Sequence, residues 1–212
     1  MGATGSYSGS IETITDLLVR GLTAHGHHVT LFATASSSTL ASIHPTFDAG
    51  YNDDTSLWPW ELCELFNIAA AVEQAASFDV IHCQAQYAPF SLAFQRICQT
   101  PIVHTVHHTP TPPEVELWKK YAEAPFVAIS NNQAACLEGL RVVGTVRHAV
   151  DTNRFRFEPQ PDDYLLFLGR FTPGKGVLDA IHVAQRTNMR LVLAAAENNY
   201  YHEHVEQHVD GR

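Results

Sequence analysis

Short apolar runs that alternate with helical segments constrain the fold of this chain more than any other feature of its sequence. Each run is rich in valine, isoleucine or phenylalanine, and helical segments separate most of them. The runs follow one another at residues 78–83, 101–106, 125–130 and 142–146. Because short apolar strands separated by helices are typical of parallel sheets covered on both faces, the sequence predicts an α/β fold.

The alternation extends toward both ends of the chain. Apolar residues at helical spacing predict helices over residues 11–25 and 60–76, with a strand over 28–33 between them. Residues 147–163 contain Pro159 and Pro161, several charges and no long apolar run, which indicates a linker. Beyond the linker the pattern predicts a strand, a helix, a strand and the start of a helix, at residues 164–168, 176–186, 190–195 and 200–208.

These boundaries predict a Rossmann-like N-terminal domain at residues 1–146, an interdomain linker at 147–163 and a second Rossmann-like domain at 164–212. The second domain is expected to be incomplete, because a doubly wound domain is built from two βαβαβ halves and this part holds only βαβα. The first domain opens on a Gly/Ser-rich loop where such domains tend to open on a strand. We therefore expect a chain cut at both ends, whose exposed sheet edge favours a homo-oligomer.

Charge and composition exclude several classes of function. Thirteen Lys and Arg residues against 22 Asp and Glu residues give a net charge of −9, whereas a nucleic-acid binder needs a basic face. No apolar run reaches the length of about 18 residues that a membrane-spanning helix needs. The N-terminus lacks the basic and apolar parts of a signal peptide. The four cysteines form no CxxC pair, so we expect reduced thiols in a cytoplasmic protein.

The sharpest local motif lies between the strand at 164–168 and the helix at 176–186. It contains Gly169, Arg170, Lys175 and Gly176. Ligands of open α/β sheets bind at the carboxyl ends of strands, where a helix N-terminus offers free N–H groups to an anion. Arg170 and Lys175 add two positive charges, which favours a diphosphate as the ligand. The alternative is a surface turn with solvated charges.

A second candidate is His107, at the end of the strand over 101–106. Side chains alternate along an extended strand, so His104 and His107 are expected to point to different sides, which argues against a three-histidine metal centre. One polar histidine lining a cleft is the hypothesis, and a hydrogen-bonded structural histidine is the alternative.

A third candidate is the loop that precedes the first predicted helix. Gly9 and Ser10 lie in a flexible Gly/Ser-rich stretch that can bring backbone close to a ligand. The alternative is a frayed terminus in which Ser10 is an ordinary helix cap. The acidic pairs Asp53-Asp54 and Asp162-Asp163 do not form a DxD motif, so no metal site is predicted.

With these residues in hand, the chain resembles a bacterial family-four (group 1) glycosyltransferase of the two-Rossmann-domain (GT-B) type. The opening loop at 8–12 is similar to the family's Gly-Gly-x-Glu loop, and residues 78–82 to its "fDviH" strand. His148 to Asp151 is similar to its "nGvD" segment, and Gly169-Arg170 with Lys175-Gly176 to its "GR…KG" motif. Further matches are residues 25–32, 101–108 and 127–130.

The resemblance implies retaining transfer of a sugar from a nucleotide diphosphate sugar, expected to be a UDP-sugar, to an acceptor, without a metal or other cofactor. Carried over to this sequence, Arg170 and Lys175 hold the donor diphosphate, and His107 is the catalytic histidine that faces the transferred sugar. Gly9 lets the N-terminal loop approach the donor or acceptor, and Ser10 replaces the family's second loop glycine.

The resemblance also implies a missing first strand and a missing Glu-x7-Glu motif, which positions the nucleotide ribose and the sugar. On that basis an active enzyme needs a complementary C-terminal chain or a domain-swapped copy to complete the donor site. The alternative function is a catalytically inactive, truncated homologue that acts as a nucleotide-sugar-binding or structural module.

Overall fold

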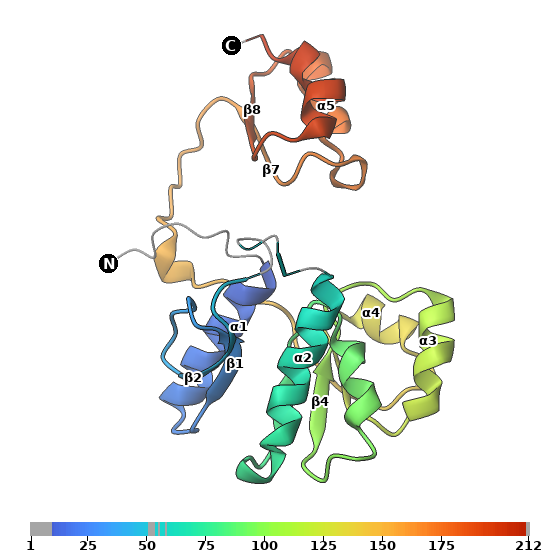
Figure 1. Ribbon diagram of the computed structural model, residues 1–212. Helices are drawn as coiled ribbons and strands as arrows, with labels where there is room; N and C mark the ends of the chain where they lie inside the picture. The colour runs from blue at the N-terminus through green and yellow to red at the C-terminus, as the bar shows by residue number, and fades with distance from the viewer. Residues whose placement is uncertain (1–9, 51–53, 55, 58, 211–212) are drawn as a thin grey trace. The chain divides into compact units, whose positions relative to one another are not determined.

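The computed structural model describes residues 10–50, 54, 56–57 and 59–210. The chain divides into two compact units, Met1–Thr152 and Asn153–Arg212. Figure 1 shows helices and strands alternating along both units, and each unit is described by itself below.

The first unit alternates helices and strands along most of its length. Its helices are α1 (Ser10–Ala24), α2 (Trp60–Glu73), α3 (Pro112–Trp118) and α4 (Asn131–Cys136). Its strands are β1 (Thr30–Thr34), β2 (Ser42–Phe47), β3 (Ile81–Cys83), β4 (Ile102–Thr105), β5 (Phe126–Ala128) and β6 (Val142–Thr145).

The strands of the first unit pair in parallel. β1 pairs with β2, with Thr30 opposite Ser42. β3, β4, β5 and β6 form a second sheet in that order, in which Ile81 lies opposite Ile102. The prediction of an α/β fold with parallel sheets is confirmed. The helix predicted at 60–76 is shorter than expected, because α2 ends at Glu73 and a 3-10 turn follows.

Strand β2 has no counterpart among the predicted strands. Pro45 lies within it and lacks the backbone N–H that a central strand needs, so β2 is an edge strand. Asn67 of α2 ties this sheet to the helix above it. Its Nδ2 donates to the carbonyl oxygen of Phe32 at 3.0 Å, and its Oδ1 accepts from the Thr46 hydroxyl at 2.6 Å.

The core of the first unit lies around β4 and β5. Phe126 on β5 is fully buried between the rings of His104 and Trp118. The buried cluster also contains Leu92, Val106, Val115, Ala124, Ala128 and Leu137. Helix α3 begins with a capping box in which Glu114 accepts from the backbone N–H and the hydroxyl of Thr111.

The second unit contains β7 (Leu165–Leu168), α5 (Val177–Thr187) and β8 (Leu191–Ala194). β7 and β8 pair in parallel, with Leu165 opposite Leu191. The predicted C-terminal helix is a wide turn of π type over Tyr201–Val205 followed by a 3-10 turn. A buried cluster of Phe171, Val177, Ile181 and Val205 holds these elements together.

Two features of the described residues concern membranes and metal ions. No helix among them has both the length and the apolar character needed to cross a membrane. Within the same residues, no three His, Cys, Asp or Glu side chains come together as the ligands of a metal ion would.

Candidate active site

His107 follows β4 at the carboxyl end of that strand. Two residues lie between it and His104, which is fully buried on the strand itself. The His104 ring bonds to the hydroxyl of Ser91 at 2.6 Å and to Oε1 of Gln95 at 2.9 Å. His104 is therefore a hydrogen-bonded structural histidine. His107 contacts a different set of side chains, as the alternation along the strand predicts.

The His107 ring is held between a glutamine and a second histidine. Its Nε2 lies 2.7 Å from Oε1 of Gln84, and its Nδ1 lies 3.2 Å from Nε2 of His148. A carbonyl oxygen only accepts hydrogen bonds, so His107 carries its proton on Nε2 and presents Nδ1 as an acceptor. His148 then donates to that acceptor from its own Nε2.

Polar contacts continue from Gln84 to the neighbouring strands. Nε2 of Gln84 lies 2.8 Å from Nε2 of His82, which in turn lies 2.8 Å from the hydroxyl of Thr105. His82 belongs to β3 and Thr105 to β4, and these strands are adjacent and parallel. Parallel strands end at the same edge of a sheet, which explains why residues far apart in the sequence meet here.

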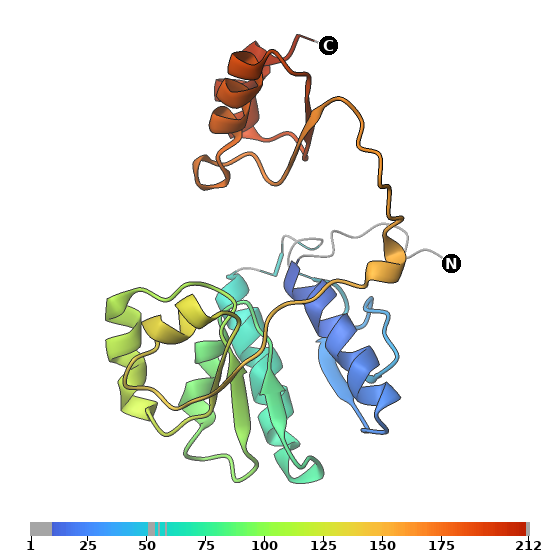
Figure 2. The same ribbon diagram turned by 180° about the vertical axis from the view of Figure 1, so that it is seen from behind.

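His148 reaches this edge from the segment that follows β6. Figure 2 shows the chain after β6 crossing the first unit toward α1. His148 lies on this segment, and its contact with His107 places it at the carboxyl end of β4.

The environment of His107 keeps its imidazole neutral. Burial, together with the neighbouring rings of His148, His82 and His108, lowers its pKa to about 4. A neutral imidazole with a protonated Nε2 offers one acceptor at Nδ1, which suits a hydrogen-bond donor such as a hydroxyl group. At neutral pH the ring is therefore a neutral hydrogen-bond acceptor at Nδ1 and not a cation.

The Arg170–Lys175 turn of the second unit is the other predicted site. It begins where β7 ends, and Phe171 anchors it by burying its ring against Phe167 and Tyr201. Nδ2 of Asn198 donates to the carbonyl oxygen of Phe171 at 2.9 Å. The anchored phenylalanine leaves its neighbour Arg170 exposed at the strand end.

Helix α5 begins directly after this turn. Gly176 at its N-cap has a φ of 73°, a left-handed conformation that favours glycine. Lys175 is exposed, and neither Arg170 nor Lys175 forms an ion pair with another described residue. The turn thus contains two cations without an ion-pair partner among the described residues, and it precedes a helix N-terminus whose first turn also holds the carboxylate of Asp179.

The remaining predicted site residues belong to the N-terminal loop. Gly9 lies outside the described residues, and Ser10 is the first residue of α1. The candidate residues thus fall into two groups. His107 lies in the first unit, and Arg170 and Lys175 lie in the second.

Sequence reasoning did not identify Gln84 and His148 as site residues. Gln84 directly follows β3, and the rule that ligands bind at the carboxyl ends of parallel strands was a signal for it. His148 lies 41 residues after His107, and no local pattern links the two.

The residues 11–154 match the model of glycosyltransferase family 4. This range covers about two thirds of the chain and includes β3, β4, His107 and His148. The chain belongs to glycosyltransferase family 4. A comparison with curated proteins gave no match. The matched range of the family 4 domain ends before Arg170 and Lys175, so their role stays a prediction from the sequence and from the geometry of their turn.

Proposed function

We propose that this family 4 protein transfers a sugar from a nucleoside diphosphate sugar to an acceptor hydroxyl, with retention at the anomeric carbon and without a metal ion. The bond between the anomeric carbon and the diphosphate oxygen breaks, and its electron pair leaves with the diphosphate. The acceptor oxygen forms the new bond to the same carbon, and its proton passes to the departing diphosphate. A UDP-sugar is the proposed donor.

Arg170 and Lys175 are proposed to bind the donor diphosphate. The observation that carries the proposal is the pair of unpaired cations at the carboxyl end of β7 in a member of a glycosyltransferase family. Lys175 lies two residues before the start of α5, whose dipole also favours an anion. Because negative charge grows on the diphosphate as the sugar leaves, the same two side chains stabilise the transition state.

His107 is proposed to contact the transferred sugar. Its neutral ring, fixed by Gln84, presents the Nδ1 acceptor that His148 now occupies. A sugar hydroxyl that displaces His148 takes over the same hydrogen bond. We also propose a cytoplasmic location, which the four free cysteines support.

Titration with UDP, GDP and ADP tests the donor site. Charge-assisted hydrogen bonds contribute about 1.5–3 kcal/mol, so Arg170→Ala and Lys175→Ala are each expected to weaken binding about 10-fold or more. Arg186→Ala is the matched control, because Arg186 is an exposed arginine in the last turn of α5, at the opposite end of that helix from the Arg170–Lys175 turn. This variant should bind nucleotide like the wild type. Calorimetric titration measures all three variants.

Two outcomes would contradict the donor site. The first is no binding of any nucleotide at millimolar concentration. The second is binding that neither Arg170→Ala nor Lys175→Ala weakens relative to Arg186→Ala.

We further propose that a second copy, or a complementary C-terminal chain, completes the donor site. The exposed face of the β7–β8 sheet supports this proposal. Leu166 is 57% exposed and Leu168 79% exposed, whereas Leu165 and Phe167 point to the opposite face. Light scattering of the protein alone is expected to give the mass of a dimer or a larger assembly. The Leu168→Glu variant is expected to give a smaller mass. A monomeric mass for the wild type would rule out self-assembly.

A further inference from the structure

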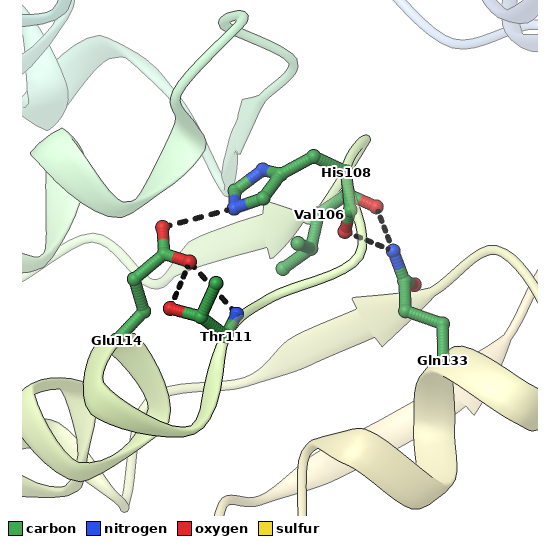
Figure 3. Close-up of polar contacts among 5 residues, drawn as sticks. All are labelled: Val106, His108, Thr111, Glu114 and Gln133. Carbon is green, nitrogen blue, oxygen red and sulfur yellow. Dashed lines mark hydrogen bonds and ion pairs between the residues drawn. The ribbon is translucent and has the colours of Figure 1, made fainter. Parts of the chain in front are cut away.

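Gln133 lies on α4 and has a buried side-chain amide whose hydrogen bonds all go to backbone groups. Its side chain is 3% exposed, although glutamine is usually a surface residue. Nε2 donates to the carbonyl oxygen of Val106 at 2.9 Å and to that of His108 at 2.7 Å. Oε1 accepts from the backbone N–H of Ile129 at 2.8 Å. Figure 3 shows the amide reaching both carbonyl groups.

The two carbonyl groups belong to the residues on either side of His107. The backbone of His107 is therefore pinned before and after the residue by a single side chain. Two such bonds to the flanking residues restrict the backbone dihedrals of the residue between them, and the rotamers open to a side chain depend on those dihedrals. Gln133 thus acts on the residue whose ring meets Gln84 and His148.

Hydrogen bonds between β4 and β5 do not by themselves fix the backbone of residues 106–108. The N–H of Val106 donates to the carbonyl oxygen of Val127 at 3.2 Å, and β5 then ends at Ala128. Beyond that point Gln133 donates to the carbonyl groups that the neighbouring strand no longer reaches. Its Oε1 also accepts from Ile129, so one amide joins the ends of both strands. A buried backbone group without a partner is costly, which explains a fully bonded glutamine here.

His108, the residue that follows His107, is also fixed by contacts of its own side chain. The ring of His108 lies 3.2 Å from Oε1 of Glu114 and stacks on the ring of Tyr87. Glu114 also accepts from Thr111 in the capping box of α3, as Figure 3 shows. The residue after His107 is therefore held by its side chain as well as by its carbonyl oxygen. Among these contacts, only those of Gln133 reach both neighbours of His107.

We propose that Gln133 is a positioning residue that aims the His107 ring at Gln84 and leaves Nδ1 directed at the substrate position. It acts through the backbone and does not touch the substrate. The proposal rests on the proposed function only for the contact between His107 and a sugar. The orientation of the ring is a property of the protein alone and is measured without any substrate.

Nuclear magnetic resonance of the imidazole nitrogens tests the proposal. In the wild type, His107 is expected to show one tautomer, with the proton on Nε2, and a pKa of about 4. Gln133→Met removes all three hydrogen bonds and keeps an unbranched side chain of similar length. In this variant the ring is expected to populate both tautomers, and its pKa is expected to rise toward the ordinary histidine value as solvent reaches it.

Asn132→Ala is the matched control, because Asn132 is the exposed neighbour of Gln133 on the same helix. Its His107 signals should match those of the wild type. A folded Gln133→Met protein with an unchanged His107 tautomer and pKa would overturn the proposal. Loss of nucleotide binding does not affect this readout, so a failed donor site and a failed positioning role give different results.

The wild type provides the test if Gln133→Met does not fold. Its Gln133 amide protons are expected to exchange with solvent far more slowly than those of the exposed Gln185, and to show couplings across the bonds to Val106 and His108. Fast exchange without these couplings would overturn the proposal. Slow exchange together with a single His107 tautomer supports it.

Discussion

Replacing Phe126 with alanine is expected to destabilise the first unit by about 3–5 kcal/mol, because large-to-small substitution in a core removes apolar contacts and leaves a cavity. Phe126 is fully buried on β5, and β5 lies between β4 and β6. Its ring contacts Trp118 and His104, so the cavity would open between the strand that precedes His107 and helix α3.

Denaturant unfolding followed by tryptophan fluorescence measures this loss. The chain has three tryptophans, Trp58, Trp60 and Trp118, and all of them precede Asn153, where the second unit begins. The fluorescence therefore reports on the first unit alone. Leu117→Ala is the matched control, since Leu117 is 59% exposed and adjoins buried Trp118 on α3. A Phe126→Ala variant no less stable than Leu117→Ala would contradict this account of the core.

Acid is expected to destabilise the first unit well above the pH at which most carboxylates titrate. Burial lowers the pKa of His104 to about 4, with a contribution from His82. In the unfolded chain a histidine has a pKa of about 6.5, so between these values the unfolded state binds a proton that the folded state does not. The contribution of His104 to the free energy of unfolding is fully present above about pH 6.5 and is lost as the pH drops toward 4.

The loss from His104 alone is on the order of 3 kcal/mol, since each pKa unit corresponds to about 1.4 kcal/mol. The lowered pKa values of His107 and His82 act in the same direction. Fluorescence-detected unfolding at several pH values between about 4 and 8 measures how steeply the free energy of unfolding depends on pH. His104→Gln is expected to reduce this dependence on pH, and His27→Gln, at an exposed position after α1, is the control that keeps the buried imidazole. A pH-independent stability in the wild type would contradict the assignment.

Much of the fold follows from local patterns. The runs at 78–83, 101–106, 125–130 and 142–146 are β3, β4, β5 and β6, because apolar residues bounded by turn residues report on burial without any knowledge of tertiary contacts. The same dependence on local pattern explains why β2 is not predicted. Pro45 and His44 interrupt the apolar pattern, and an edge strand depends on its neighbour more than on its own sequence.

The candidate site was predictable in part. The carboxyl-end rule identifies His107, and the alternation along a strand separates it from the buried His104. The same rule pointed to Arg170 and Lys175, whose role as diphosphate ligands stays a prediction. Gln84 and His148 were not identified because they lie 23 and 41 residues from His107 in the chain. Their contacts depend on the order of strands in the sheet, and no local pattern encodes that order.

The sequence by itself determined the α/β class, the parallel strands and the family resemblance, since these depend on hydrophobic periodicity and on motifs in a fixed order. Only the tertiary structure decided which side chains surround His107. The tautomer of that ring, its lowered pKa and its support by Gln133 arise from contacts between strand ends and helix α4. Such contacts form when β4 and β5 pair, because the pairing brings the ends of both strands within reach of one buried amide.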